Sequence, residues 1–265
     1  MVAVVFFGKK CKIVFPIGES NPAPSLTQKN VKLCAEKCAT DYNVTREESD
    51  AYAKMSFERA LSEEAVAFVS EEITPVVVSD KVTVSTDEQL KMFKPDKMGG
   101  LRSAFIPNGT ATAANSSSMS DGASALVIAS AEAVEKYGFT ILAKIIGYAD
   151  AAQNGMDFPT APSLAIPKAL KMAGKSIEEV DFFEINEAFS VVALANNKIL
   201  GLNVDKVNVY GGAVSRGHPL GCSGARITGS LAGILKKKGG RIGCASICNG
   251  GGGGSAIVLQ YEGGI

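Results

Sequence analysis

The sequence lacks an excess of charge of either sign, and it lacks a long apolar run. Its 265 residues carry 27 lysines and arginines against 27 aspartates and glutamates. Nucleic-acid-binding domains usually display a basic stripe, so this balance excludes nucleic acid as an expected partner. No stretch reaches the roughly 18 apolar residues that span a bilayer, and we expect no membrane segment. The short apolar run at 1–7 is better interpreted as a buried strand than as a signal peptide.

Cysteine and histidine are also scarce. The six cysteines are too few and too scattered for a disulfide scaffold, which favours a reducing compartment. Cys34 and Cys38 have no histidine nearby and lie in a helical pattern, so we do not expect them to bind a metal. His218 is the single histidine of the chain.

Apolar strand-like segments alternate with helical ones from Asp121 onward, which is typical of a layered α/β domain. The predicted strands are 123–129, 141–148, 182–184, 206–210, 241–247 and 255–261. The predicted helices between them are 131–137, 164–173, 188–200 and 224–237.

The part before Asp121 is less regular. We predict strands at 12–17, 73–78 and 81–84, a loop at 18–24, and an exposed, positively charged loop at 91–102. A helix is expected over 31–40, and Thr45 with Glu48 forms a capping-box pattern that opens a second helix. Its expected buried residues are Ala51, Tyr52, Met55, Phe57 and Ala60. Residues 108–120 are small and polar, which by composition favours a flexible linker over an ordered ligand-binding loop.

Three segments contain residues suited to chemistry. His218 stands between Gly217 and Pro219, just before a helix N-terminus, where a neutral imidazole can donate to an oxyanion or move a proton. Cys248 ends an apolar strand and is followed by five glycines, more than a simple turn requires. Gly250 N–H is a candidate oxyanion donor there.

Each of these residues also has a plainer interpretation. His218 can be an incidental loop histidine, and the glycine run a turn between two strands. Asn186, at a strand-to-helix junction, can simply cap the helix, although its amide can also hold a catalytic water.

These segments resemble the signatures of thiolases. The resemblance rests on NEAF (186–189), GGAVSRGHPLGCSGARI (211–227) and CNGGGGGSAIVLQ (248–260), and the form SICNGGGG is similar to the acetyl-CoA acetyltransferase branch. Upstream, TATAANSSSMSDGASAL (110–126) resembles the family's CoA-binding loop, which replaces the linker interpretation. CAEKCATDYNVTREESDAYA (34–53) resembles a helix of its loop domain.

The resemblance implies a fold and an activity. The expected fold is a thiolase-like layered α/β/α fold, with a complete C-terminal domain at 142–265. Residues 1–141 would be a remnant of the N-terminal domain, with a shortened loop domain at about 19–120. The implied activity is acetyl-CoA C-acetyl transfer: condensation of two acetyl-CoA to acetoacetyl-CoA, and the reverse thiolysis.

The resemblance also implies residue roles. Cys248 would be the acid/base at the acetyl methyl group, His218 would bind the thioester oxygen, Asn186 would hold a water, and Gly250 N–H would serve a second oxyanion hole. The residues expected to contact coenzyme A or its acyl group are Ser117, Phe105, Phe158 and Phe189. The residues expected to offer backbone ligands to a potassium ion are Ala113, Ala114, Ser116 and Val214. Phe57 stands where potassium-dependent members have a tyrosine.

The sequence departs from the family pattern at its start. Only 17 residues precede Gly18, and none of them matches the Cys-Ala-Ser-Gly segment that carries the family's nucleophile. Cys11, on an expected ordinary strand, does not replace it. The sequence therefore predicts a thiolase truncated in its N-terminal half, with a catalytically inactive CoA-binding protein or an incomplete gene model as the alternative.

The family further implies acyl-CoA as the ligand, no covalently bound cofactor and a homo-oligomer, either dimer or tetramer. It also implies a role in fatty acid or ketone body metabolism in mitochondrion or cytoplasm.

Overall fold

The structure is a computed structural model that describes residues 2–5 and 28–263. Within these residues six strands form one mixed sheet in the order β4-β1-β5-β8-β7-β6. Its strands are β1 (Val2–Val5), β4 (Val127–Ser130), β5 (Ala143–Ala152), β6 (Phe182–Ile185), β7 (Ile242–Asn249) and β8 (Gly253–Gln260). Strands β6 and β7 pair in parallel, and the other neighbours pair antiparallel.

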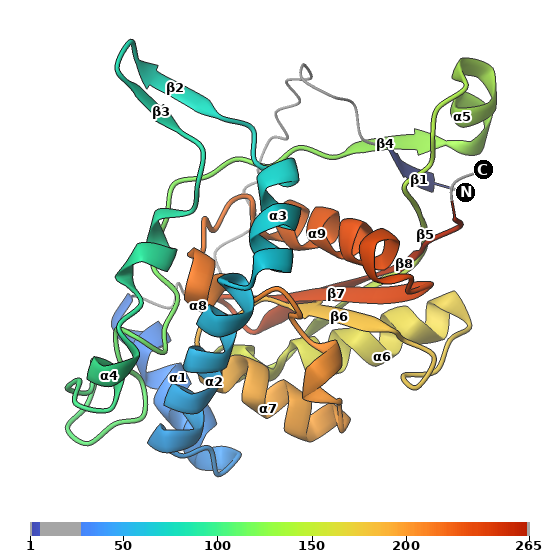
Figure 1. The fold of residues 1–265 in the computed structure, drawn as a ribbon. Coiled ribbons are helices and arrows are strands. Elements are labelled where there is room, and N and C mark those ends of the chain that lie inside the picture. Colours follow the sequence, from blue (N-terminus) through green and yellow to red (C-terminus); the bar gives the residue numbers. More distant parts are fainter. Residues whose placement is uncertain (1, 6–27, 264–265) are drawn as a thin grey trace.

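Helices pack on both faces of this sheet (Figure 1). On one face, α6 (Pro162–Ala173) packs against β5 and β8, and its Ala165, Ile166 and Ala169 join the largest apolar cluster. On the other face, α9 (Ser223–Lys238) packs against β7 and β6 through Leu231 and Leu235. The result is the layered α/β arrangement that the alternation predicts.

A second group of helices lies beside the sheet and carries much of the N-terminal part of the chain (Figure 1). The group contains α1 (Gln28–Asp41), α2 (Arg46–Ala60), α3 (Glu63–Glu72) and α7 (Ser190–Leu200). The predicted capping box of α2 is confirmed, because Thr45 Oγ1 accepts from Glu48 N–H and Glu48 Oε2 accepts from Thr45 N–H. Tyr52, Phe57 and Ala60 are buried as predicted, whereas Ala51 is exposed and Met55 half-buried.

The remaining elements are short. They are β2 (Val76–Ser79), β3 (Val82–Val84), a 3₁₀ turn at Glu88–Met92, α4 (Pro95–Met98), α5 (Ala131–Tyr137), a 3₁₀ turn at Gly155–Thr160, a 3₁₀ turn at Val204–Lys206 and α8 (Ala213–Arg216). Strands β2 and β3 form a hairpin that stands apart from the main sheet, with all seven residues exposed (Figure 1).

Two predictions of local structure are wrong. Residues 91–102 are not a simple exposed loop, because they form a 3₁₀ turn and α4 and bury Met98. Residues 206–210 are not a strand. Val207 makes an isolated parallel bridge to Phe183. Asn208 then has φ +49° and its side-chain amide bonds Ile185 N–H and Ile185 O, so the backbone pairing does not continue into a strand.

The remaining predictions concern the N-terminal segment, the helix at 131–137 and the absence of a membrane span. Cys11, the predicted strand at 12–17 and the predicted loop at 18–24 lie outside the described residues. The helix at 131–137 is confirmed with the same bounds. Among the described residues, no helix is both long and apolar enough to cross a bilayer.

Candidate functional site

The parallel pairing of β6 and β7 brings two predicted site residues to the same edge of the sheet. Ile185 is paired with Ser246, and Asn186 N–H donates to Ser246 O at 2.9 Å. Asn186 therefore follows the end of β6, and Cys248 is the second-last residue of β7, a neighbouring strand that runs in the same direction. In open α/β sheets the carboxyl ends of parallel strands are the usual place for ligand sites.

His218 reaches the same place from the loop between α8 and α9. Its Nε2 lies 3.3 Å from Asn186 Nδ2, and its Nδ1 lies 2.6 Å from Ser223 Oγ. Asn186 does not cap α7, since Phe189 occupies the N-cap position without a side-chain hydrogen bond. The structure thus joins Asn186 to His218 and removes the capping interpretation of Asn186.

The surroundings of His218 favour a neutral imidazole. Burial, and after it the positive charge of Arg226, lowers the pKa of His218 below its ordinary value of about 6.5. Ser223 Oγ also donates to Pro219 O at 3.0 Å, and in that arrangement it accepts from His218 Nδ1–H. A histidine fixed at one nitrogen and neutral at pH 7 is prepared to act through its other nitrogen.

Cys248 lies in a small apolar cluster with Phe158, Val192 and Cys34. Burial raises the pKa of the Cys248 thiol to about 12. At rest this residue is therefore a neutral thiol, and its thiolate, once formed, is a strong base.

The glycine run after Cys248 has a structural explanation for part of its length. A Cβ at Gly252 would lie 2.1 Å from Gln153 O, and a Cβ at Gly254 would lie 2.7 Å from the Ala161 carbonyl carbon. Gly252 also has φ +99°, a conformation that favours glycine. Gly250, the candidate oxyanion donor, lies in the exposed turn between β7 and β8 with open space around its Cα.

Residues 115–119 form an ordered segment between Asn186 and His218. Ser117 donates to Ala188 O through both its N–H (3.1 Å) and its Oγ (2.9 Å). Ser118 O accepts from His218 N–H at 2.8 Å. The linker interpretation of this region is therefore wrong, because its backbone is bonded to His218 and to Ala188, two residues after Asn186.

Three phenylalanines predicted to contact ligand lie close to this segment. Phe189 packs against the Cys248 cluster, which contains Phe158. Its ring also meets that of Phe105 edge-on, with centroids 5.9 Å apart. Phe105 lines a cavity of about 590 Å³ with Arg46 and residues 101–109. Contacts between apolar side chains thus run from the Cys248 cluster through Phe189 to Phe105 at this cavity.

Two of the four residues predicted to hold potassium lie in one cluster. Ala114 and Val214 belong to one cluster with Phe57, whose ring is stacked on Phe93 and offers no oxygen. Ser116 Oγ is buried and has no hydrogen-bond partner within the described part of the chain. Ala113 is exposed.

Sequence reasoning missed Glu187, the fully buried neighbour of Asn186. Its carboxylate accepts from Tyr52 OH, Ser56 OH, Asn208 Nδ2 and Val214 N–H, at 2.9–3.0 Å. The signal available in the sequence was an acidic residue at the junction between an apolar strand and an apolar helix. Such a residue is rarely buried unless it is paired.

Comparison with known proteins identifies the family of this chain. Residues 139–261 match the family model "Thiolase, C-terminal domain", and residues 22–132 match "Thiolase, N-terminal domain". Acetyl-CoA acetyltransferase 1 of Arabidopsis thaliana is 53% identical over 235 residues, which cover 86% of this chain and 57% of that protein. The acetyl-CoA acetyltransferase of Schizosaccharomyces pombe is 51% identical, with 85% and 58% covered. The chain thus spans less than two thirds of the length of these relatives.

Solved structures show the same fold. The crystal structure of the Bacillus anthracis acetyl-CoA acetyltransferase superposes with a TM-score of 0.83 at 38% identity, covering 87% of this chain and 60% of that one. Human mitochondrial 3-ketoacyl-CoA thiolase in complex with CoA gives a TM-score of 0.85 at 34% identity, covering 98% and 70%. The predicted fold class is confirmed.

Proposed function

Because this chain belongs to the thiolase family, we propose that it carries the acid–base and oxyanion-binding part of an acetyl-CoA C-acetyltransferase. The observation that carries the proposal is the His218–Asn186 contact at the edge of the sheet where Cys248 also lies. The substrate class is acyl-CoA, which the 53% identity to an acetyl-CoA acetyltransferase supports. We assign residues 142–265 to the C-terminal domain of the fold.

The proposed chemistry starts at the methyl group of acetyl-CoA. The Cys248 thiol first loses its proton to solvent. The resulting thiolate takes a methyl proton, the electron pair of the C–H bond forms the C=C bond of an enolate, and the carbonyl π pair moves onto the thioester oxygen. His218 and a water on the Asn186 amide hold that oxygen. A thiolate whose conjugate acid has a pKa of about 12 is basic enough to assist this transfer.

The proton on His218 must be on Nε2 for this role. Ser223 sets the tautomer: if its hydroxyl donates to Nδ1 instead of to Pro219 O, the imidazole carries its proton on Nε2. The Asn186 amide, 3.3 Å away, then turns its oxygen toward Nε2–H until a thioester oxygen replaces it.

The complete transfer also needs a nucleophile that accepts the acetyl group, and the Cys-Ala-Ser-Gly segment that supplies it in the family is not among the 265 residues. The proton-transfer half of the reaction does not need that nucleophile. This difference separates the proposal from its alternative, a catalytically inactive CoA-binding protein.

We also propose a potassium site formed by Ala113, Ala114, Ser116 and Val214. The buried, unpartnered Ser116 Oγ supplies a side-chain oxygen where Phe57 supplies none. A bound potassium ion would contribute positive charge that orders this segment. A rise in melting temperature with KCl but not with choline chloride supports the site, and equal values contradict it.

The proton-transfer half is tested by deuterium exchange into acetyl-CoA. Incubation with the protein in D₂O, followed by mass spectrometry, measures methyl exchange. We expect exchange with the unmodified chain and a fall of about 10²-fold or more with Cys248→Ala or His218→Asn. Cys244→Ala is the matched control, because Cys244 is a buried cysteine of the same strand that lies in the core cluster.

The outcomes separate the candidates. CoA binding without methyl exchange favours the inactive CoA-binding protein. If the protein neither binds CoA nor exchanges the methyl protons, the proposal that its ligand is an acyl-CoA is contradicted. Thiolysis of acetoacetyl-CoA that both substitutions abolish would show that the chain does not need the missing nucleophile.

A further inference from the structure

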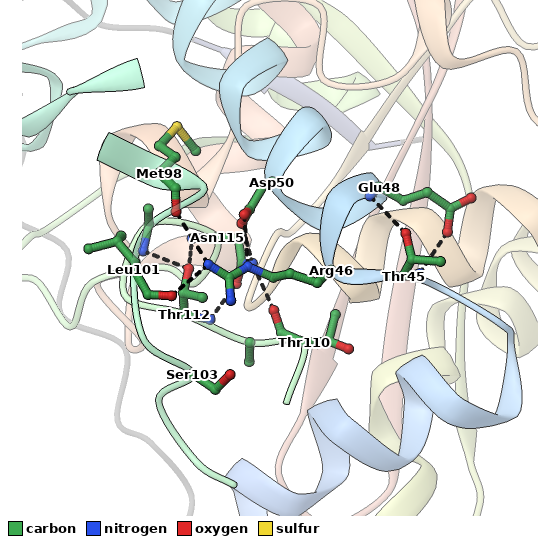
Figure 2. A network of polar contacts seen from close by, with 12 residues as sticks. Thr45, Arg46, Glu48, Asp50, Met98, Leu101, Ser103, Thr110, Thr112 and Asn115 are labelled. Carbon is green, nitrogen blue, oxygen red and sulfur yellow. Dashed lines mark hydrogen bonds and ion pairs between the residues drawn. The ribbon is translucent and has the colours of Figure 1, made fainter. Parts of the chain in front are cut away.

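The first turns of α2 hold a polar network that no predicted role explains (Figure 2). Arg46 Nε donates to Asp50 Oδ2 at 2.7 Å. The Arg46 Nη2 group donates to two backbone carbonyls, Leu101 O at 2.8 Å and Met98 O at 3.3 Å. One arginine therefore fixes both the helix and the segment that leads to Phe105.

Asp50 extends this network to the small-residue loop. Its other oxygen, Oδ1, accepts from Asn115 Nδ2 at 2.8 Å. The Asn115 amide also donates to Thr110 O and accepts from Thr112 N–H, so its hydrogen-bonding groups are used and its side chain is buried. Figure 2 shows Asn115 between Asp50 and the loop.

The backbone that follows Asn115 reaches the candidate site directly. Asn115 O accepts from Ser190 N–H at 2.9 Å, at the start of α7. Ser117 then bonds Ala188 O, and Ser118 O holds His218 N–H. A displacement of Asn115 is transmitted along two or three residues to His218.

Residues 110–120 offer little apolar surface with which to hold their position. Their side chains are Ala, Thr, Ser and Asn, apart from the exposed Met119. Hydrophobic burial scales with apolar area, so packing contributes little here. Charge-assisted hydrogen bonds are the strong contacts left to fix the loop. The N–H groups of Thr110 and Ala111 donate to the Glu36 carboxylate at its start, and Asn115 donates to Asp50, the carboxylate nearer to residues 115–118.

We propose that Arg46, Asp50 and Asn115 are positioning residues that set residues 115–118 between Asn186 and His218. Through Ser117 and Phe105 they also set the affinity of the site for a CoA thioester. The second part rests on the proposed function, whereas the first part concerns the free protein alone.

The test uses three variants in the full chain, Asp50→Asn, Arg46→Lys and Asn115→Ala. The matched control is Glu58→Gln, because Lys54 and Glu58 form an exposed i,i+4 pair on the same helix, 3.7 Å apart. Far-UV circular dichroism identifies any variant that fails to fold. Arg46→Lys keeps the charge but loses the forked contact to two carbonyls, so it separates geometry from charge.

The first measurement follows the free protein. The chain has one histidine, so the imidazole signals in an NMR spectrum belong to His218 without further assignment. We expect shifted His218 signals and faster amide exchange over 112–119 in the three variants, and neither change in Glu58→Gln. A folded variant set with unchanged His218 signals and exchange overturns the proposal.

The second measurement is the dissociation constant of CoA by calorimetry. Loss of one charge-assisted hydrogen bond corresponds to about a tenfold weaker affinity, which we expect for Asp50→Asn. Unchanged affinity in a variant with a displaced loop overturns the part that concerns CoA. Failure of the unmodified chain to bind CoA contradicts the proposed function and with it that part, while the His218 signals still decide the positioning role.

Discussion

Helix α2 is held by two polar anchors that differ in depth. The inner anchor is Glu187, fully buried, which receives four donors from α2, α8 and Asn208. The outer anchor is Arg46 with Asp50, whose side chains keep 20% and 14% of their surface exposed. Water can replace a lost partner at the outer anchor but not at the inner one. The inner anchor should therefore determine stability, and the outer anchor the position of a loop.

The largest predicted effect is at the inner anchor. Glu187→Ala leaves Tyr52 OH and Val214 N–H without their acceptor in a buried place and removes one contact each from Ser56 and Asn208. Each unsatisfied buried group costs about 1–3 kcal/mol. We expect a loss of about 4 kcal/mol or more in the free energy of unfolding, measured by urea denaturation. Glu47→Gln, an exposed acidic residue of α2, is the control. A loss below about 1 kcal/mol would remove the distinction between the anchors.

Removing a single donor from Glu187 should have a smaller effect. Tyr52→Phe deletes the hydroxyl that lies 2.9 Å from Glu187 Oε1 and leaves the ring in place. We expect destabilisation of about 1.5 kcal/mol, since Asn208 and Val214 still satisfy the carboxylate. The same urea titration measures it, and a cost equal to that of Glu187→Ala would show that the anchor fails as a unit.

The outer anchor should contribute less to stability. Arg46→Met keeps most of the side-chain volume but loses the ion pair and the two carbonyl contacts. Partial exposure limits the expected loss to about 1 kcal/mol. A loss as large as that of Glu187→Ala would contradict the assignment of this anchor to positioning.

The smallest effect concerns pH at His218, the residue at the far end of the positioned segment. Its pKa is lowered by burial, so the unfolded chain binds the proton more readily than the folded one. Stability should fall as the pH drops below about 6.5, and an NMR titration of the single histidine should give a midpoint below that value. A midpoint above 6.5 would place the imidazole in a more polar environment than the structure shows.

Short-range patterns in the sequence were sufficient for most elements but not for every one. The capping box at Thr45 and the helix at 131–137 depend on neighbouring residues, and both are confirmed. The predicted strand at 206–210 fails because Asn208 makes side-chain bonds to Ile185, a contact between distant residues. The spacing of apolar residues along the chain cannot indicate that the Asn208 side-chain amide will bond to the backbone of Ile185.

The candidate site shows the same limit. Resemblance named His218, Asn186 and Cys248, whose roles stay proposals, and the structure adds how close two of them lie. The composition of residues 108–120 suggested a flexible linker, because composition shows that the residues are small and polar but not which distant residues they bond to. Asp50 and Glu187, which hold the site from outside, lie within two of the segments that resemble the family, yet their pattern gives neither residue a role.

The parallel pairing of β6 with β7 also has a consequence for folding during synthesis on the ribosome. The ribosome makes Asn186 before Cys248, and Cys248 follows only after α7, α8 and α9 have been added. Pairing across such a separation is slow, because the loop must close before the contacts form. A nascent chain therefore passes through a stage in which the apolar face of α9 has no strand β7 to cover, and chaperones would be most needed then.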